Sequence, residues 1–113
     1  MNRQTVYFVS FASNEPFLAL LKISRETDKC IYYSIEKIYT EHEGAYLPWC
    51  LKWSTKIRKA NLSNAAIFDN YHTAVDWLIN KINTYSAYLN KQINHYNSKA
   101  EEIKKLKNYF NKQ

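Results

Sequence analysis

The sequence predicts an α+β fold, in which an antiparallel meander of three to four strands precedes one long C-terminal helix with coiled-coil-like heptads. Alternating apolar and polar residues dominate the first part of the chain, and a seven-residue apolar repeat runs through the last part. No linker separates the two patterns. We therefore expect the 113 residues to form a single domain, with a β-sheet part at residues 1–68 and a helical part at residues 69–113.

Three runs rich in β-branched and aromatic residues predict the first three strands. Residues 5–11 place apolar side chains on both faces of the predicted strand, so we expect this strand to be covered on both faces. Residues 17–23 and 30–39 follow, separated by polar turns at residues 13–16 and 25–28. This spacing is typical of an antiparallel meander. The Leu and Ala content of residues 17–23 also permits a helix, but their length and the hairpin context favour a strand.

Residues 46–59 predict a fourth strand with one apolar and one basic face. Trp49, Leu51, Trp53 and Ile57 alternate with polar residues, so we expect both tryptophans to pack between the sheet and the helix. The short apolar run at residues 65–68 is either a brief edge strand or the approach to the helix.

The opposite face of the fourth strand is the first candidate binding surface. Lys52, Lys56 and Arg58 share this face, Lys59 follows, and Tyr32 joins them if the third strand pairs with the fourth. Cations beside an aromatic ring on an open sheet can bind phosphates and stack bases. The alternative is a solubilising face that keeps a sheet edge from aggregating.

The helix is predicted from about Tyr71 to the C-terminus, with Asp69 or Asn70 as its N-cap. We expect its first turns to lie on the sheet through a set of apolar residues: Ala74, Val75, Leu78, Ile79 and Ile82. A helix break near Asn97 is the alternative, because residues 98–101 match a capping box. The unbroken heptad phase favours a continuous helix.

The heptad repeat continues past what a small sheet can cover, since about 40 helical residues extend for about 60 Å. Its apolar and aromatic positions form the second candidate surface, the helical interaction seam: Tyr85, Tyr88, Leu89, Tyr96, Ile103 and Phe110. Exposed aromatic side chains on a helix are typical of a partner surface. We expect a homodimer through this helix, or else a helical hairpin folded at residues 96–98.

No catalytic motif is present in the sequence. The single glycine excludes Gly-rich phosphate loops, and the three histidines, His42, His72 and His95, are widely spaced along the sequence. The carboxylates form no pair at helical spacing. We therefore expect no enzyme activity, no cofactor and no metal site. Cys30 and Cys50 would meet if their strands adjoin, and otherwise remain two reduced thiols.

The net charge of +6 and the pI of about 9.3 favour anionic partners. No signal peptide and no membrane-spanning run is apparent, which predicts a cytoplasmic protein without membrane contact, in the host cytoplasm if it is phage-encoded. A short, Gly-poor chain rich in residues with AT-rich codons is typical of phage and mobile-element proteins.

These features predict a small non-enzymatic binding protein that inhibits a host defence or nucleic-acid enzyme by occlusion, as anti-CRISPR proteins do. Its partner would be a host protein or a nucleoprotein complex. The alternative is a protein that binds DNA or RNA directly with the basic sheet face, and the two differ in their response to salt.

Overall fold

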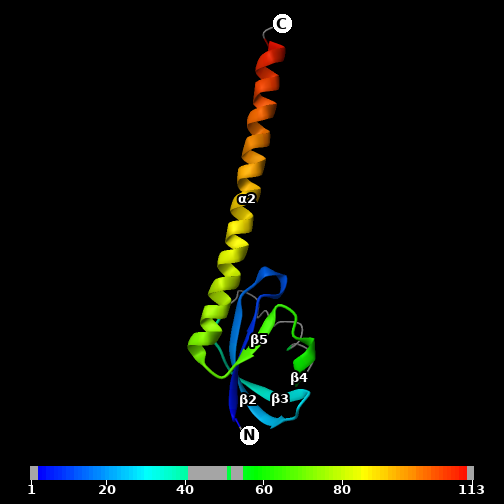
Figure 1. The fold of residues 1–113 in the computed structure, drawn as a ribbon, viewed down its shortest axis with the longest axis vertical. Coiled ribbons are helices and arrows are strands. Elements are labelled where there is room, and N and C mark those ends of the chain that lie inside the picture. Colours follow the sequence, from blue (N-terminus) through cyan, green and yellow to red (C-terminus); the bar gives the residue numbers. More distant parts are fainter. Residues whose placement is uncertain (1–2, 41–50, 52–54, 112–113) are drawn as a thin grey trace. The chain divides into compact units, whose positions relative to one another are not determined.

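The computed structural model describes residues 3–40, 51 and 55–111, with the side chains of residues 61 and 108–111 excepted. Within these residues the chain forms five strands and one long helix (Figure 1). The elements are β1 (Thr5–Ser10), β2 (Phe17–Glu26), β3 (Cys30–Ile38), β4 (Lys56–Arg58), β5 (Ala65–Phe68) and α2 (Tyr71–Asn111), with short 3-10 turns at Ala12–Asn14 and Lys59–Asn61. The α+β fold predicted from the sequence is confirmed.

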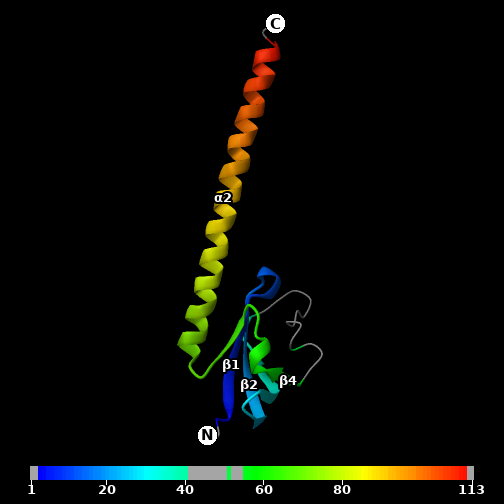
Figure 2. The same cartoon turned by 45° about the vertical axis from the view of Figure 1, so that its right-hand side comes forward.

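All neighbouring strands are antiparallel, and their order in the sheet is β4-β3-β2-β1-β5. The first four strands form the predicted meander. The chain then returns to the far edge, where β5 pairs with β1 through partners such as Tyr7 and Phe68. Residues 65–68 are therefore an edge strand, and β1 lies between β2 and β5. Figure 2 shows β1 and β2 side by side.

The sheet has an apolar layer on each face because β1 and β2 carry buried apolar residues on both sides of their alternation. On one face Phe8 of β1 packs with Phe17 of β2, with ring centroids 6.2 Å apart. On the other face Val9 and Leu18 pack against the first turns of α2. The expectation that the first strand is covered on both faces is confirmed.

The predicted fourth strand does not extend over the whole of residues 46–59. Of its described residues, 51 and 55–59, Lys56–Arg58 is extended in a ladder and Leu51 has a helical backbone. Leu51 and Ile57 are buried, as expected for the apolar face of this segment, and they lie in the layer that contains Phe8, on the face opposite the helix. Trp49 and Trp53 lie outside the described residues.

The first turns of α2 show how the helix lies on the sheet. Asn70 is the N-cap, since its Oδ1 accepts a hydrogen bond from the Thr73 amide at 3.2 Å. Ala74 and Leu78, one turn apart, are buried against Val9 and Leu18, and Val75 is partly buried.

Two residues predicted to face the sheet do not. Ile79 and Ile82 are 47% and 40% exposed. A helix on a sheet buries a narrow stripe at spacings of three and four residues, so Ile79, next to Leu78, points aside from it. Ile82 is one turn beyond Leu78 on the same stripe, but the buried cluster that α2 covers ends at Leu78. The helix continues without a break through Asn97 to Asn111, as the heptad phase favoured.

The chain divides into two units, Met1–Ile82 and Asn83–Gln113. The first contains the sheet with the first turns of α2, and the second contains the rest of α2. In the described part of the chain, no helix combines the length and apolar character needed to cross a membrane.

Candidate functional site

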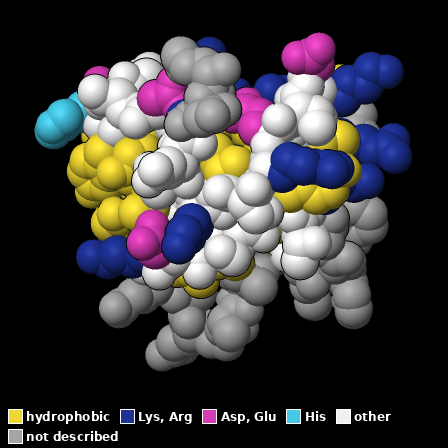
Figure 3. Space-filling view, turned by 90° about the horizontal axis from the view of Figure 1, so that it is seen from below, with side chains coloured by type: hydrophobic (Ala, Val, Ile, Leu, Met, Phe, Trp, Pro, Cys, Tyr) yellow, Lys and Arg dark blue, Asp and Glu magenta, His cyan; other side chains and the backbone are white. Residues whose placement is uncertain are grey.

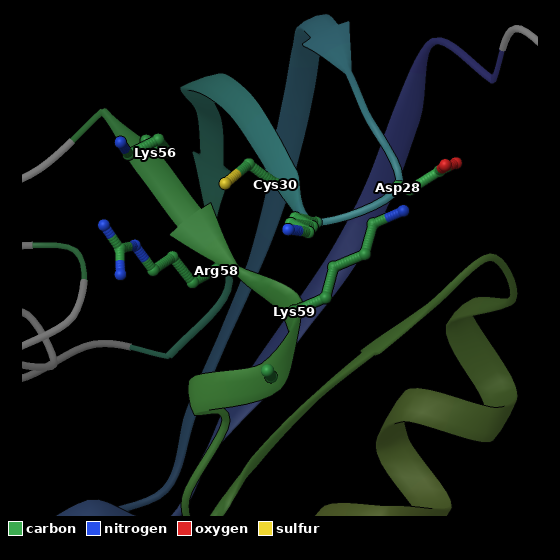
Figure 4. Close-up of a pocket in the computed structure, with 7 residues that line it drawn as sticks. Asp28, Cys30, Lys56, Arg58 and Lys59 are labelled. Carbon is green, nitrogen blue, oxygen red and sulfur yellow. The ribbon is translucent and has the colours of Figure 1, made fainter.

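A groove of about 730 Å³ opens beside the β3–β4 ladder of the first unit (Figure 4). We call it the basic groove and define it by the residues that line it: Asp28, Lys29, Cys30, Lys56, Arg58, Lys59 and Ala60. Four of these seven side chains are cationic and one is anionic. The groove is therefore suited to an anionic ligand or surface.

Strand register brings these residues together. Cys30 is opposite Arg58 and Tyr32 is opposite Lys56, so side chains two apart on each strand share one face. The tight turn between β2 and β3 places Lys29 at the end of this ladder. Within this turn, the Thr27 hydroxyl accepts hydrogen bonds from the amides of Lys29 and Cys30, at 3.3 and 3.0 Å.

The segment that follows β4 and lines the groove is hydrogen-bonded to the same turn. The Lys59 amide donates a hydrogen bond to the Lys29 carbonyl at 2.8 Å, where the chain leaves β4. In Figure 4, Cys30 on β3 lies beside β4, which carries Lys56 and Arg58, while Lys59 extends toward the side that carries Asp28. Two separate chain segments, residues 28–30 and residues 56–60, thus line the groove and supply its cations.

Tyr32 extends this surface along β3. The Arg25 guanidinium from β2 lies 4.3 Å from the centre of the Tyr32 ring, and the Lys56 ammonium lies 5.9 Å from it. Both are cation–π contacts, which hold flexible cations in a preferred position. Figure 3 shows Lys and Arg side chains next to hydrophobic ones on one end of the molecule.

An ion-pair network borders the groove. The Glu26 carboxylate contacts the Lys59 ammonium at 2.7 Å and the Arg3 guanidinium at 2.8 Å, and Arg3 also reaches Asp69 at 2.7 Å. Hydrogen bonds from Arg3, and then from Lys59, lower the pKa of Glu26 from 4.5 to about 2. The hydrogen bonds that Arg3 donates to Glu26 and to Asp69 raise the pKa of Arg3. Glu26 therefore stays ionised and offsets the charge of Lys59.

The structure brings together Tyr32, Lys56 and Arg58, as the alternation predicted. Lys59 lines the groove, but its ammonium is paired with Glu26. Lys52 lies outside the described residues.

Three residues of this surface were missed by the sequence reasoning: Arg25, Asp28 and Lys29. Residues 25–28 were predicted as a turn, whereas Arg25 and Glu26 belong to β2. A register that pairs the first residue of β3 with the last residue of β4 would have placed the turn beside Arg58, but the sequence does not fix that register.

The helical interaction seam is the second candidate surface. Within the second unit Tyr88, Leu89, Tyr96 and Ile103 are 54%, 41%, 67% and 64% exposed. Tyr85 is half-buried, and its ring stacks on Tyr88 with centroids 6.2 Å apart. The side chain of Phe110 lies outside the described residues. The described seam residues thus present a row of large apolar side chains to solvent.

Other candidate chemistry is sparse in the part of the chain that the structure describes. No group of three or more His, Cys, Asp or Glu side chains is arranged there to hold a metal ion. Cys30 is a half-buried free thiol, and Cys50 lies outside the described residues. The rings of His72 and His95 lie against those of their neighbours Tyr71 and Tyr96.

Comparisons with models of known protein families, with curated proteins and with solved structures find no match to this chain.

Proposed function

We propose that this chain is a small non-enzymatic binding protein that inhibits its partner by occlusion. The basic groove docks on an anionic site of a host enzyme or nucleoprotein complex and keeps the natural ligand away. This is the mode of action of a phage or mobile-element protein directed against a host defence or nucleic-acid enzyme, in the manner of an anti-CRISPR protein. The single observation that carries the proposal is the basic groove.

The cations of the groove support this mode because they are held in place before a partner arrives. Lys59 is fixed by Glu26, and Lys56 shares the Tyr32 ring with Arg25. A long side chain that is already ordered loses less conformational freedom on binding than one that is mobile. Clustered positive charge also accelerates encounter with an acidic surface.

Direct binding of DNA or RNA is the second candidate, and Tyr32 is the observation that favours it. Cations beside an aromatic ring are a common arrangement on single-strand-binding sheets. Here the Arg25 guanidinium already lies over the ring at 4.3 Å. A base that stacks from that side must first displace it, which favours contacts with phosphates or carboxylates over base stacking.

Charge reversal tests the proposal. The groove variant carries Lys29→Glu, Lys56→Glu and Arg58→Glu. Each change removes two units of charge, so the net charge falls from +6 to zero. The control variant carries three matched changes on exposed positions of α2: Lys91→Glu, Lys104→Glu and Lys105→Glu. Both variants have the same net charge, so a difference between them reports the location of the charge and not its total.

The tagged parent and both variants are used to capture partners from host lysate, with and without nuclease, and are assayed for inhibition of the captured enzyme. We expect the groove variant to lose capture and inhibition, mainly through slower association, while the control keeps both. Equal behaviour of the two variants, with both folded, would refute the proposal.

Fluorescence anisotropy with a single-stranded oligonucleotide tests the second candidate. If the groove binds nucleic acid directly, log affinity falls steeply with log salt, and the slope shrinks by about one unit for each lost phosphate contact in the groove variant. Capture that survives nuclease treatment, with weak oligonucleotide binding, favours the protein partner.

A further inference from the structure

The second unit is amphipathic along its described length. When Leu89 is taken as the first position of a heptad, the exposed apolar residues lie on one face of the helix. In addition to the seam residues, this face carries Ile93 and Leu106, which are 55% and 53% exposed. The opposite face carries a different set: Asn83, Thr84, Asn90, Lys91, Asn94, Asn97, Ser98, Glu101, Lys104 and Lys105. This division into an apolar and a polar side is that of a coiled-coil helix.

The chain does not cover this apolar face by folding back at residues 96–98. The helical hairpin expected as an alternative to the dimer requires a break there, and α2 is continuous from Tyr71 to Asn111. We propose that the seam binds a second copy of this chain in an antiparallel coiled coil, in which Leu89 of each copy packs against Leu106 of the other. This inference is independent of the proposed function, because it uses a different surface.

The exposed area is large enough for a dimer. Six large side chains of the second unit are between 41% and 67% exposed: Tyr88, Leu89, Ile93, Tyr96, Ile103 and Leu106. At about 100 Å² for each, they present roughly 600 Å² per copy, so that two copies bury roughly 1,200 Å². That value lies at the lower end of the range of specific protein interfaces.

Lys99 selects the antiparallel orientation. It occupies the heptad position between the Tyr96 and Ile103 layers, on the seam side of the helix. In a parallel pair each residue of this row meets its own copy, so the two Lys99 ammonium groups would face each other in the interface. In the antiparallel register that pairs Leu89 with Leu106, Lys99 instead meets Tyr96 of the second copy, where a cation–π contact is available.

The flanking positions agree with the same register. In an antiparallel pair, residues on one flank of the seam meet the corresponding flank of the second copy. Ile93 of one copy then lies beside Ala100 of the other, so two apolar residues are in contact. His95 of one copy lies beside Glu102 of the other. A parallel pair would gain one exposed ion pair between Glu102 and Lys107, a contact of small value at a solvated surface.

Cysteine cross-linking tests the orientation. In a background with Cys30→Ser and Cys50→Ser, Leu89→Cys and Leu106→Cys are introduced into separate chains carrying different tags. Each chain is oxidised alone and then as a mixture with the other. We expect the mixture to form the disulfide-linked heterodimer rapidly, because the two positions are opposite each other, and each chain alone to remain largely uncrosslinked.

Light scattering coupled to size exclusion gives the state of the unmodified chain, with twice the chain mass of 13.5 kDa expected at high micromolar concentration. Rapid self-cross-linking of each single variant, without the mixed product, would show a parallel pair and overturn the assignment. A chain that stays at 13.5 kDa and cross-links in no combination would overturn the dimer itself. Both cysteines replace exposed residues, so folding of the variants is checked by helicity alone.

Discussion

The ion pairs of Glu26 lower its pKa, so its ionisation stabilises the described fold, and Glu26→Gln should expose that contribution. The carboxylate joins Arg3, near the N-terminus, to Lys59 at the end of β4. A pKa lowered from 4.5 to about 2 corresponds to about 3 kcal/mol of stabilisation if water did not screen the charges. The side chains of Glu26 and Arg3 are 20% and 25% exposed, so we expect about 2 kcal/mol at pH 7.

The sign of the pH dependence follows from the direction of the shift. A carboxyl whose pKa is lower in the folded state stabilises the fold above its unfolded pKa, and this stabilisation is lost as pH falls toward the folded value. The gap in unfolding free energy between the parent and Glu26→Gln should therefore be complete at pH 7 and shrink between about pH 5 and pH 2.

Urea unfolding at fixed protein concentration, followed by Trp fluorescence and helicity at several pH values, measures this gap. Glu101→Gln is the matched control: Glu101 contacts Lys104 at 3.3 Å, but both side chains are mostly exposed, and the change should cost less than about 0.5 kcal/mol. A gap between parent and Glu26→Gln that stays constant from pH 7 to pH 2 would show that the carboxylate charge contributes nothing, and the reasoning would be wrong.

Three further changes probe the core, the seam and the groove. Leu78→Ala, at a buried position between helix and sheet, should cost about 2–5 kcal/mol in urea unfolding, whereas Ile79→Ala, at an exposed position, should cost less than about 1 kcal/mol. Leu89→Asp together with Ile103→Asp should convert the dimer to a monomer by light scattering while leaving the unfolding of the first unit unchanged; a persisting dimer would exclude the seam. Tyr32→Ala should weaken partner binding about 3–10-fold by releasing two cations, and unchanged binding would show that the ring does not order them.

Much of the fold could be predicted from local sequence pattern. Residues 5–11 were recognised because they are rich in β-branched and aromatic side chains, and residues 17–23 and 30–39 because their side chains alternate as in a strand. Asn70 was recognised because its side chain can cap a helix. The helix itself was recognised from its heptads. In each case the decisive physical signal lies within a few neighbouring residues.

The rest depends on long-range packing. Apolar residues on both sides of β1 show that two layers exist, but not which layer the helix covers, so the layer that contains Ile57 could not be predicted. The alternation around Leu51 fits a strand, yet an apolar residue can be buried equally well from a helical turn. Lys29 joined the basic groove only because β3 and β4 pair in one particular register.

The position of β1 has a consequence for how the chain folds. One edge of β1 pairs with β2 across a short turn. The other edge pairs with β5, which is separated from β1 by more than half the length of the chain in sequence. Such non-local pairing slows folding to milliseconds or longer. During synthesis, at about 5–20 residues per second, the open edge stays unpaired for several seconds. The chain is therefore most prone to edge-to-edge aggregation before residues 65–68 have emerged and β5 has paired with β1.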